Sequence, residues 1–205
     1  MGKYSIWVLD YAAVNKFPQS VMLYGPQYVG IRNLPYAYVL IKGQGQVILV
    51  DTGYDHKEYG KYLADLYGVS NWHPASEVLA ECGVTPADVT TVFITHAHFD
   101  HMGGLDLFPN AKFYIQKREI DKWVWALTLG PEFRFLVGAA DPADIVKATR
   151  LASPSASASS TTWSPAAVAR DGKTVLSRSS CTGITRLCSP PTAFNISALE
   201  NSRFD

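Results

Sequence analysis

The chain has 205 residues, of which 47% are hydrophobic and 18% are charged, so it can bury one sizeable core and a wholly disordered protein is excluded. Its 18 basic side chains balance its 18 acidic ones; without an overall positive field, neither nucleic acid nor a membrane surface is an expected partner. No apolar stretch approaches the ~20 residues that cross a bilayer, and the first residues lack the apolar core of a signal peptide, so we expect a cytoplasmic protein.

Three segments near the N-terminus predict the start of a sheet. Residues 4–11 and 37–41 are rich in the aromatic and β-branched side chains that strands favour. Residues 47–50, Val-Ile-Leu-Val, follow a Gly-Gln-Gly turn. The second and third segments therefore predict a β-hairpin.

Helices and strands alternate after the hairpin. A short amphipathic helix is expected to begin at Pro74 and to end at Gly83, where a left-handed residue can stop it. Residues 89–95 are a nearly all-apolar, β-branched run, which predicts a strand covered on both faces. Residues 111–116 predict another strand, followed by a helix over residues 117–129. This alternation indicates an α/β fold class.

Composition changes abruptly near Leu151. Residues 1–150 hold four serines, all eleven tyrosines and all five histidines, whereas the last 55 residues hold twelve serines and neither of the other two types. We therefore divide the chain into an N-terminal half-domain, 1–150, and a Ser/Ala/Pro-rich tail, 151–205. Residues 151–165 are too small and polar to offset their ordering entropy by burial, which predicts a linker or disorder. Beyond them only 171–176 predicts a turn entering a strand, because the remainder has no helical or alternating period.

A histidine cluster directly follows the predicted strand 89–95. The run His-Ala-His-Phe-Asp-His-Met-Gly-Gly begins at His96 and includes His98, Asp100 and His101. Neutral imidazoles and a carboxylate are ligands that zinc prefers, and a loop pinned to a strand end can aim several of them at one point. The glycine pair lets the backbone come close to the site. A chance histidine-rich loop is the alternative, but the clustering favours a metal site.

The remaining histidines and the cysteines form no second cluster. His56 and His73 stand alone in polar segments, and we expect them to be solvated and without a functional role. Cys82, Cys181 and Cys188 lack Cys-x-x-Cys spacing, so neither a disulfide framework nor a zinc ribbon is expected.

The His-x-His-x-Asp-His run resembles that of the metallo-β-lactamase superfamily. Residues 50–55, Val-Asp-Thr-Gly-Tyr-Asp, are similar to an earlier Asp-Thr-Gly segment of that superfamily. Residues 106–116, together with Tyr24 and Gly25, are similar to its N-acyl homoserine lactonase branch, whose activity is quorum quenching. The resemblance covers about residues 3–151.

This resemblance implies an αββα sandwich with a site for two zinc ions at one edge of its sheets. His96 and His98 match ligands of the first ion, and Asp100 and His101 match ligands of the second. Asp100 would also act catalytically by carrying a proton to the leaving alkoxide. Asp51 matches a position that orients a ligand; a simple turn-forming Asp is the alternative.

The implied function is hydrolysis of a small-molecule lactone or ester, such as an N-acyl homoserine lactone. A glyoxalase-II-like thioester hydrolase uses the same metal chemistry and is the alternative enzyme. A diiron flavoprotein would carry Glu in place of His98, and true β-lactamases commonly lack a histidine at the position of His101. Nuclease branches are disfavoured by the neutral charge and the lack of a basic cluster.

The second half of the family's metal site is missing. The family adds a later His in a Gly-His-Thr-like segment, a bridging Asp and a final His, but no histidine follows His101. We therefore expect only the N-terminal half of the sandwich to form, with an uncovered sheet face that causes self-association. A frameshift would explain the tail, and a genuine linker is the alternative. The competing functions are a weakly active metalloenzyme and a non-catalytic metal-binding fragment.

Overall fold

A computed structural model describes residues 3–151, apart from 24, 26 and 28, and two further segments, 181–186 and 193–199. Its strands are β1 (Tyr4–Pro18), β2 (Ile31–Gly43), β3 (Gln46–Val50), β4 (Val69–Ser70), β5 (Thr91–Ile94), β6 (Lys112–Ile115), β7 (Cys181–Arg186) and β8 (Ala193–Leu199). Its helices are α1 (Gln19–Met22), α2 (Glu58–Tyr67), α3 (Ala75–Ala80), α4 (Phe99–Met102), α5 (Lys117–Leu127) and α6 (Pro142–Leu151), with 3-10 turns η1 (Pro86–Asp88), η2 (Leu105–Leu107) and η3 (Pro131–Val137). Among the described residues, no helix is long and apolar enough to cross a membrane.

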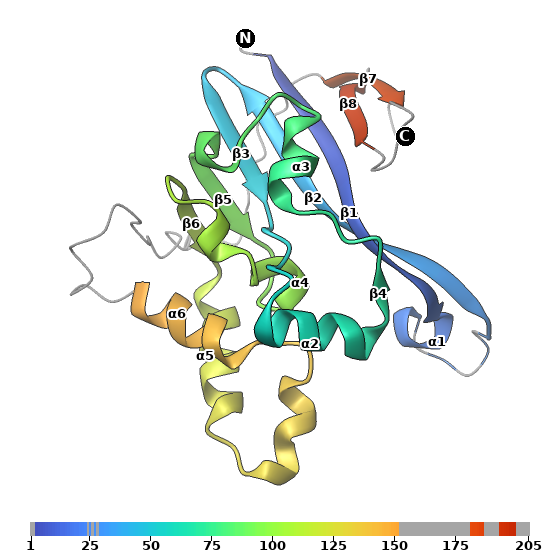
Figure 1. Ribbon diagram of the computed structural model, residues 1–205, viewed down its shortest axis with the longest axis vertical. Helices are drawn as coiled ribbons and strands as arrows, with labels where there is room; N and C mark the ends of the chain where they lie inside the picture. Colours follow the sequence, from blue (N-terminus) through green and yellow to red (C-terminus); the bar gives the residue numbers. More distant parts are fainter. Residues whose placement is uncertain are drawn as a thin grey trace, which may run out of the picture.

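The described strands form one mixed sheet (Figure 1). Along the sheet the order is β6-β5-β3-β2-β1-β8-β7, and β4 pairs with β1. Strands β3, β5 and β6 are parallel to one another, whereas the other neighbours are antiparallel. The β2–β3 hairpin turns at Gln44 and Gly45 with φ of 52° and 75°, as a type I′ turn requires. The predicted hairpin and the α/β fold class are thus confirmed.

The sequence prediction for the tail is wrong in one respect. Beyond 171–176 no strand was expected, yet β7 and β8 lie there, and β8 pairs antiparallel with β1 at the register of Ile6 with Ile196. A strand can add to a sheet edge through backbone hydrogen bonds, which need no side-chain alternation. Residues 152–165 of the predicted linker and the predicted strand 171–176 lie outside the described residues. The domain division at residue 151 stays a prediction.

One face of the sheet carries the hydrophobic core. Helix α3 packs against β1, while α2 contacts α4 and α5 contacts α6. Burial of each core side chain stabilises the fold by roughly 1.5–3 kcal/mol. The buried sheet residues on this face are Leu9, Tyr38, Leu40, Leu49, Val92, Ile94, Phe113 and Ile115.

The opposite face is apolar but only partly covered. In β5, Val92 and Ile94 are buried, whereas Phe93 between them is 46% exposed and stacks on Tyr114 with ring centroids 5.2 Å apart. The prediction that residues 89–95 form a strand covered on both faces is therefore wrong, because the described residues supply no second sheet over Phe93. They form the single-sheet half of the αββα sandwich, as expected. Half-buried side chains on this open face are Ile6, Val8, Val39, Ile41, Ile48, Val50 and Tyr114.

Candidate metal centre

Two loops meet where the parallel strands end. Strands β3 and β5 run parallel with Val50 opposite Phe93, so the residues that follow both strands leave the sheet at the same edge. The N–H of Asp51 donates to the carbonyl of Phe93 over 2.8 Å, which extends the ladder by one bond. Asp51 therefore lies beside the loop that begins at Thr95.

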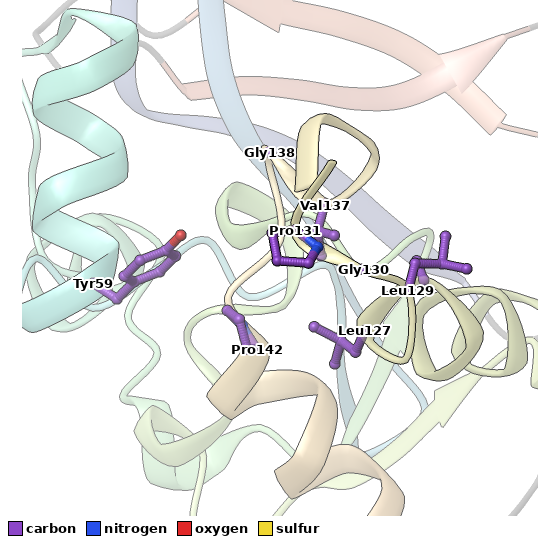
Figure 2. Close-up of a pocket in the computed structure, with 9 residues that line it drawn as sticks. Tyr59, Leu127, Leu129, Gly130, Pro131, Val137, Gly138 and Pro142 are labelled. Atoms are coloured by element: carbon purple, nitrogen blue, oxygen red, sulfur yellow. The ribbon is translucent and has the colours of Figure 1, made fainter. Parts of the chain in front are cut away.

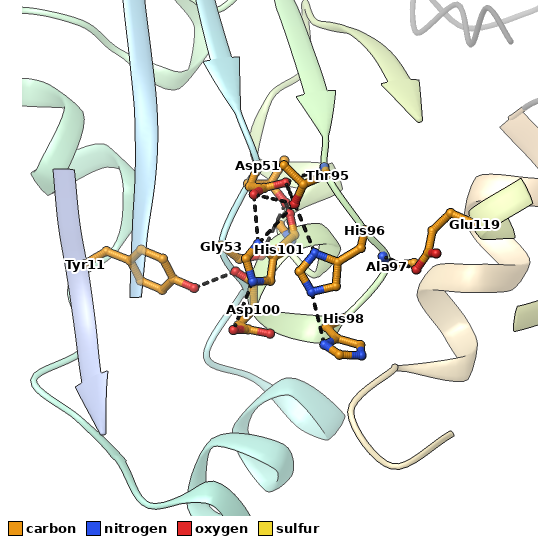
Figure 3. A network of polar contacts seen from close by, with 12 residues as sticks. Tyr11, Asp51, Gly53, Thr95, His96, Ala97, His98, Asp100, His101 and Glu119 are labelled. Atoms are coloured by element: carbon orange, nitrogen blue, oxygen red, sulfur yellow. Dashed lines mark hydrogen bonds and ion pairs between the residues drawn. The ribbon is translucent and has the colours of Figure 1, made fainter. Parts of the chain in front are cut away.

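The carboxylate of Asp51 joins these two loops (Figure 3). It accepts hydrogen bonds from the Thr95 N–H at 2.7 Å, from the Thr95 hydroxyl at 2.8 Å and from Nδ1 of His101 at 2.8 Å. Asp51 is 6% exposed and has φ of 64°, a left-handed conformation that costs an ordinary residue about 1–2 kcal/mol. Hydrogen bonds to a charged group contribute about 1.5–3 kcal/mol each and offset this cost.

Asp51 and Thr95 also decide which ring nitrogens carry a proton. Because His101 donates from Nδ1 to Asp51, its Nε2 holds the lone pair when the ring is neutral. The Thr95 hydroxyl gives its single proton to Asp51, so it accepts from Nδ1 of His96 at 3.0 Å. Nε2 of His96 is then also unprotonated. Each ring keeps one nitrogen available to a metal ion.

The four predicted ligands lie together as two donor pairs (Figure 3). Nε2 of His96 is 3.1 Å from Nδ1 of His98, and Nε2 of His101 is 3.4 Å from Oδ2 of Asp100. Two ligand atoms that each lie ~2.05 Å from one tetrahedral zinc ion are about 3.3 Å apart. Both separations are close to this value, so each pair fits two ligands of one zinc ion. The His96 and His101 ring centroids are 4.0 Å apart, which places the two pairs side by side.

Neither pair is a complete metal site. Among the described residues, no three His, Cys, Asp or Glu side chains are placed so that they could hold one ion. A catalytic zinc ion normally takes three protein ligands, and a structural one takes four. Metal binding by this cluster therefore stays a proposal.

Burial and neighbouring charges give the three histidines different proton affinities. Burial, followed by the charge of a neighbouring ring, lowers the pKa of His96 and of His98. Burial also opposes protonation of His101, but its hydrogen bonds to Asp100 and Asp51 outweigh this effect and raise its pKa to about 9. The His96–His98 pair is thus neutral at pH 7, whereas a metal ion at His101 must displace a proton.

A second carboxylate holds the loop against α5. Glu119 accepts hydrogen bonds from the N–H of Ala97 at 3.0 Å and from the indole N–H of Trp123 at 2.6 Å. Burial opposes ionisation of Glu119, but these two donors outweigh it and lower its pKa. The Trp123 ring meets the His98 ring edge-on at 5.6 Å. The sequence did not single out Glu119, although an acidic residue in the first turn of a helix that follows a parallel strand was an available signal.

The two lone histidines take no part in this cluster. Nδ1 of His56 lies 3.3 Å from the Tyr54 hydroxyl, and its ring packs against Trp72. Nδ1 of His73 lies 3.1 Å from a carboxylate oxygen of Glu77. Both histidines are half-buried, so the expectation that they are solvated is wrong; the expectation that they have no role stays a prediction.

A cavity of about 410 Å³ opens between α5, η3 and α6 (Figure 2). Its lining mixes polar and apolar surface and includes the apolar side chains Leu127, Leu129 and Val137. The carbonyl of Ala139, in the segment between η3 and α6, accepts from the N–H of Phe99 at 2.8 Å. This bond ties the segment that follows the lining residue Gly138 to the start of α4. Its volume lies in the range of ~300–1,000 Å³ that is usual for small-molecule sites.

The family profile described as the metallo-beta-lactamase superfamily matches residues 32–176, which is more than half of the chain. The chain belongs to this superfamily. The matched range contains Asp51 and the whole histidine cluster, and it continues past residue 151. Membership accounts for the order of strand, Asp-Thr-Gly segment, strand and histidine cluster.

Two curated relatives match short parts of the chain. Metallo-beta-lactamase domain-containing protein 1 of Rattus norvegicus is 48% identical over 52 residues, which cover 25% of this chain and 21% of that protein. N-acyl homoserine lactonase AttM of Azorhizobium caulinodans is 46% identical over 39 residues, which cover 19% of this chain and 15% of that protein. The match thus spans about a fifth or less of each curated relative.

Solved structures agree on the fold. AidC, described as a dizinc quorum-quenching lactonase, superposes with a TM-score of 0.53 at 20% identity, covering 94% of this chain and 70% of that one. A probable metal-dependent hydrolase from Staphylococcus aureus gives a TM-score of 0.51 at 19% identity, covering 80% of this chain and 60% of that one. At these identities the likeness establishes the fold and leaves substrate and activity to be argued from the site.

Replacing Asp51 by Asn should weaken zinc binding about 10–100-fold, because the neutral amide no longer orients Thr95 and His101 as an anionic acceptor does. Asn tolerates a left-handed backbone as Asp does, so the fold should persist, which circular dichroism checks. The matched control is Asp55→Asn, at a partly exposed carboxylate paired with Lys57, and it should leave zinc affinity unchanged. Competition with a chromophoric chelator measures the affinities; an Asp51→Asn protein that binds zinc like the wild type would contradict this role.

Proposed function

We propose that this chain is a zinc-dependent hydrolase that opens a lactone or another ester, and that it does so slowly because its metal site is incomplete. The two donor pairs carry this proposal: His96 with His98, and Asp100 with His101, each at a separation that fits one zinc ion. Membership of the superfamily and the similarity to lactonase AttM support it.

Each residue of the cluster has a defined part in the proposed reaction. When bound, a pair of zinc ions would provide hydroxide at neutral pH and polarise the ester carbonyl. Asp51 holds His101 by Nδ1, while Nε2 of His101 lies 3.4 Å from Oδ2 of Asp100. The carboxylate of Asp100 would accept the proton of the hydroxide that attacks the ester carbonyl. It would then give this proton to the leaving alkoxide oxygen, and so act first as a general base and then as a general acid.

The surroundings of the cluster suit a small neutral substrate with an apolar part. The net charge is zero, so no field draws in a polyanion. The cavity between α5, η3 and α6 has room for a small molecule and includes apolar side chains in its lining. An N-acyl homoserine lactone has both the ester and the apolar part, and we propose this class ahead of a glyoxalase-II-like thioester.

A second candidate function is a non-catalytic metal-binding fragment. One observation favours it: each donor pair offers two protein atoms, and no described third ligand completes either one. Ions held by two protein ligands exchange easily with solvent, and a dinuclear mechanism needs both at a fixed separation. Turnover distinguishes this fragment from the enzyme.

The purified chain with zinc should open N-hexanoyl homoserine lactone slowly but above the rate of zinc in buffer, as measured by the acid released. A chelator should abolish this activity, and Asp100→Asn should lower kcat about 10²–10⁴-fold through loss of proton transfer. Asp121→Asn, at an exposed carboxylate paired with Lys117 on α5, is the control and should leave kcat unchanged. Zinc binding without any turnover would favour the fragment and contradict the enzyme.

We also propose that two copies of the chain associate through the open face of the sheet. The open face carries apolar side chains on five neighbouring strands, β1, β2, β3, β5 and β6, and removing a contiguous apolar face from water favours association. A second copy presents the same apolar surface, and a two-fold axis would pack the two faces against each other as in a sandwich.

Sedimentation equilibrium over a range of concentrations should therefore detect a dimer of the wild-type chain. Phe93→Lys places a charge on the open face and should weaken the dimer at least 10-fold, because an ammonium group cannot be buried there unpaired. The control is Phe135→Lys on η3, at a side chain that is 76% exposed and away from the sheet. A wild-type chain that is monomeric at every concentration would contradict this interface.

A further inference from the structure

The single-turn helix α4 carries Asp100 and His101, and its last carbonyl groups cannot be satisfied within so short a helix. The carbonyl of His101 accepts from the N–H and the hydroxyl of Thr52 at 2.8 Å and 2.9 Å. The carbonyl of Asp100 accepts from the phenol hydroxyl of Tyr11 at 2.7 Å. Two side chains from outside the cluster thus hold the backbone of the donor pair.

Tyr11 extends from β1 toward the backbone of Asp100 (Figure 3). The register of β1 against β2 shifts between Asp10 and Ala12, so a β-bulge inserts Tyr11, and bulges turn a side chain away from its regular direction. The Tyr11 ring is 1% exposed and stacks on Tyr38, with centroids 4.4 Å apart and planes 12° apart. The bond joins residues 89 positions apart in the sequence.

The surroundings leave Tyr11 little freedom. Gly53 has φ of 63°, and a Cβ there would lie 2.6 Å from the Tyr38 ring and 3.1 Å from the Tyr11 ring, so both rings lie directly against its backbone. Its partner is a backbone carbonyl, which can only accept, so the Tyr11 hydroxyl is the donor of this bond.

We propose that Tyr11 is a positioning residue for the donor pair of Asp100 and His101. Its hydroxyl fixes the Asp100 backbone, so that Oδ2 stays 3.4 Å from Nε2 of His101. No described hydrogen bond links Tyr11 to the other pair, His96 and His98, so that pair should not depend on it. The inference rests on the metal centre proposed above, but it makes a separate claim, because a role in core stability alone would affect both pairs equally.

The test is a titration of the full chain with Co²⁺ and then Zn²⁺, in which visible absorption bands of Co²⁺ report each ligand set. Tyr11→Phe removes the hydroxyl and keeps the ring. It should weaken metal binding at the Asp100–His101 pair about 10–100-fold, as loss of a group that orients a ligand does. The affinity of the His96–His98 pair should stay within about twofold of the wild-type value. Tyr38→Phe is the matched control, since it removes a hydroxyl from the same ring stack that has no described bond to α4; both sites should be unchanged.

Three results would overturn this inference. The first is a Tyr11→Phe protein with two wild-type affinities, and the second is an equal loss at both sites. The third is metal occupancy that falls only in proportion to the fraction of protein unfolded, as circular dichroism measures it. A wild-type chain that binds neither Co²⁺ nor Zn²⁺ would instead overturn the proposed function, and the inference with it.

Discussion

The carboxylate of Asp51 lies where two parallel strands end, and the candidate site depends on what it binds. It takes hydrogen bonds from the first residue of the histidine loop and from the last histidine of the cluster, so the loop is fixed at both ends. Its left-handed backbone is tolerable because these bonds are made to a buried charge. Without them, three imidazoles and a carboxylate would belong to a less constrained loop, and ordering them around an ion would cost more conformational entropy.

The core supports the site as well as the fold. Thr52 binds the carbonyl of His101, Tyr11 binds the carbonyl of Asp100, and Glu119 binds the N–H of Ala97. These three bonds come from the buried segment that follows β3, from β1 and from α5, which are packed parts of the chain with little freedom to move. The histidine loop therefore inherits the rigidity of the sheet. A metal ion would meet donor atoms that are already close together, which lowers the cost of binding.

Local features of this structure could be predicted from the sequence, and long-range ones could not. The histidine run and the strand before it are contiguous, so their proximity follows from the chain itself. The contact of Tyr11 with Asp100 depends on a bulge in β1 and on the stacking of Tyr11 on Tyr38, which no periodicity reveals. The exposure of Phe93 could not be read from an all-apolar run, because such a run is the same whether one face or both are covered. Strand β7 lacks clear alternation, whereas β8 alternates from Phe194 through Asn195 and Ile196 to Ser197 and offered a short signal that the sequence analysis missed.

The most direct test of the account is X-ray diffraction from crystals of the full chain grown with zinc, with anomalous data collected at the zinc edge. The account predicts zinc within about 2.0–2.2 Å of Nε2 of His96 and Nδ1 of His98, and of Oδ2 of Asp100 and Nε2 of His101, with Asp51 still bonded to Nδ1 of His101. Zinc bound only at other residues, or a loop in which Asp51 has released His101, would contradict it.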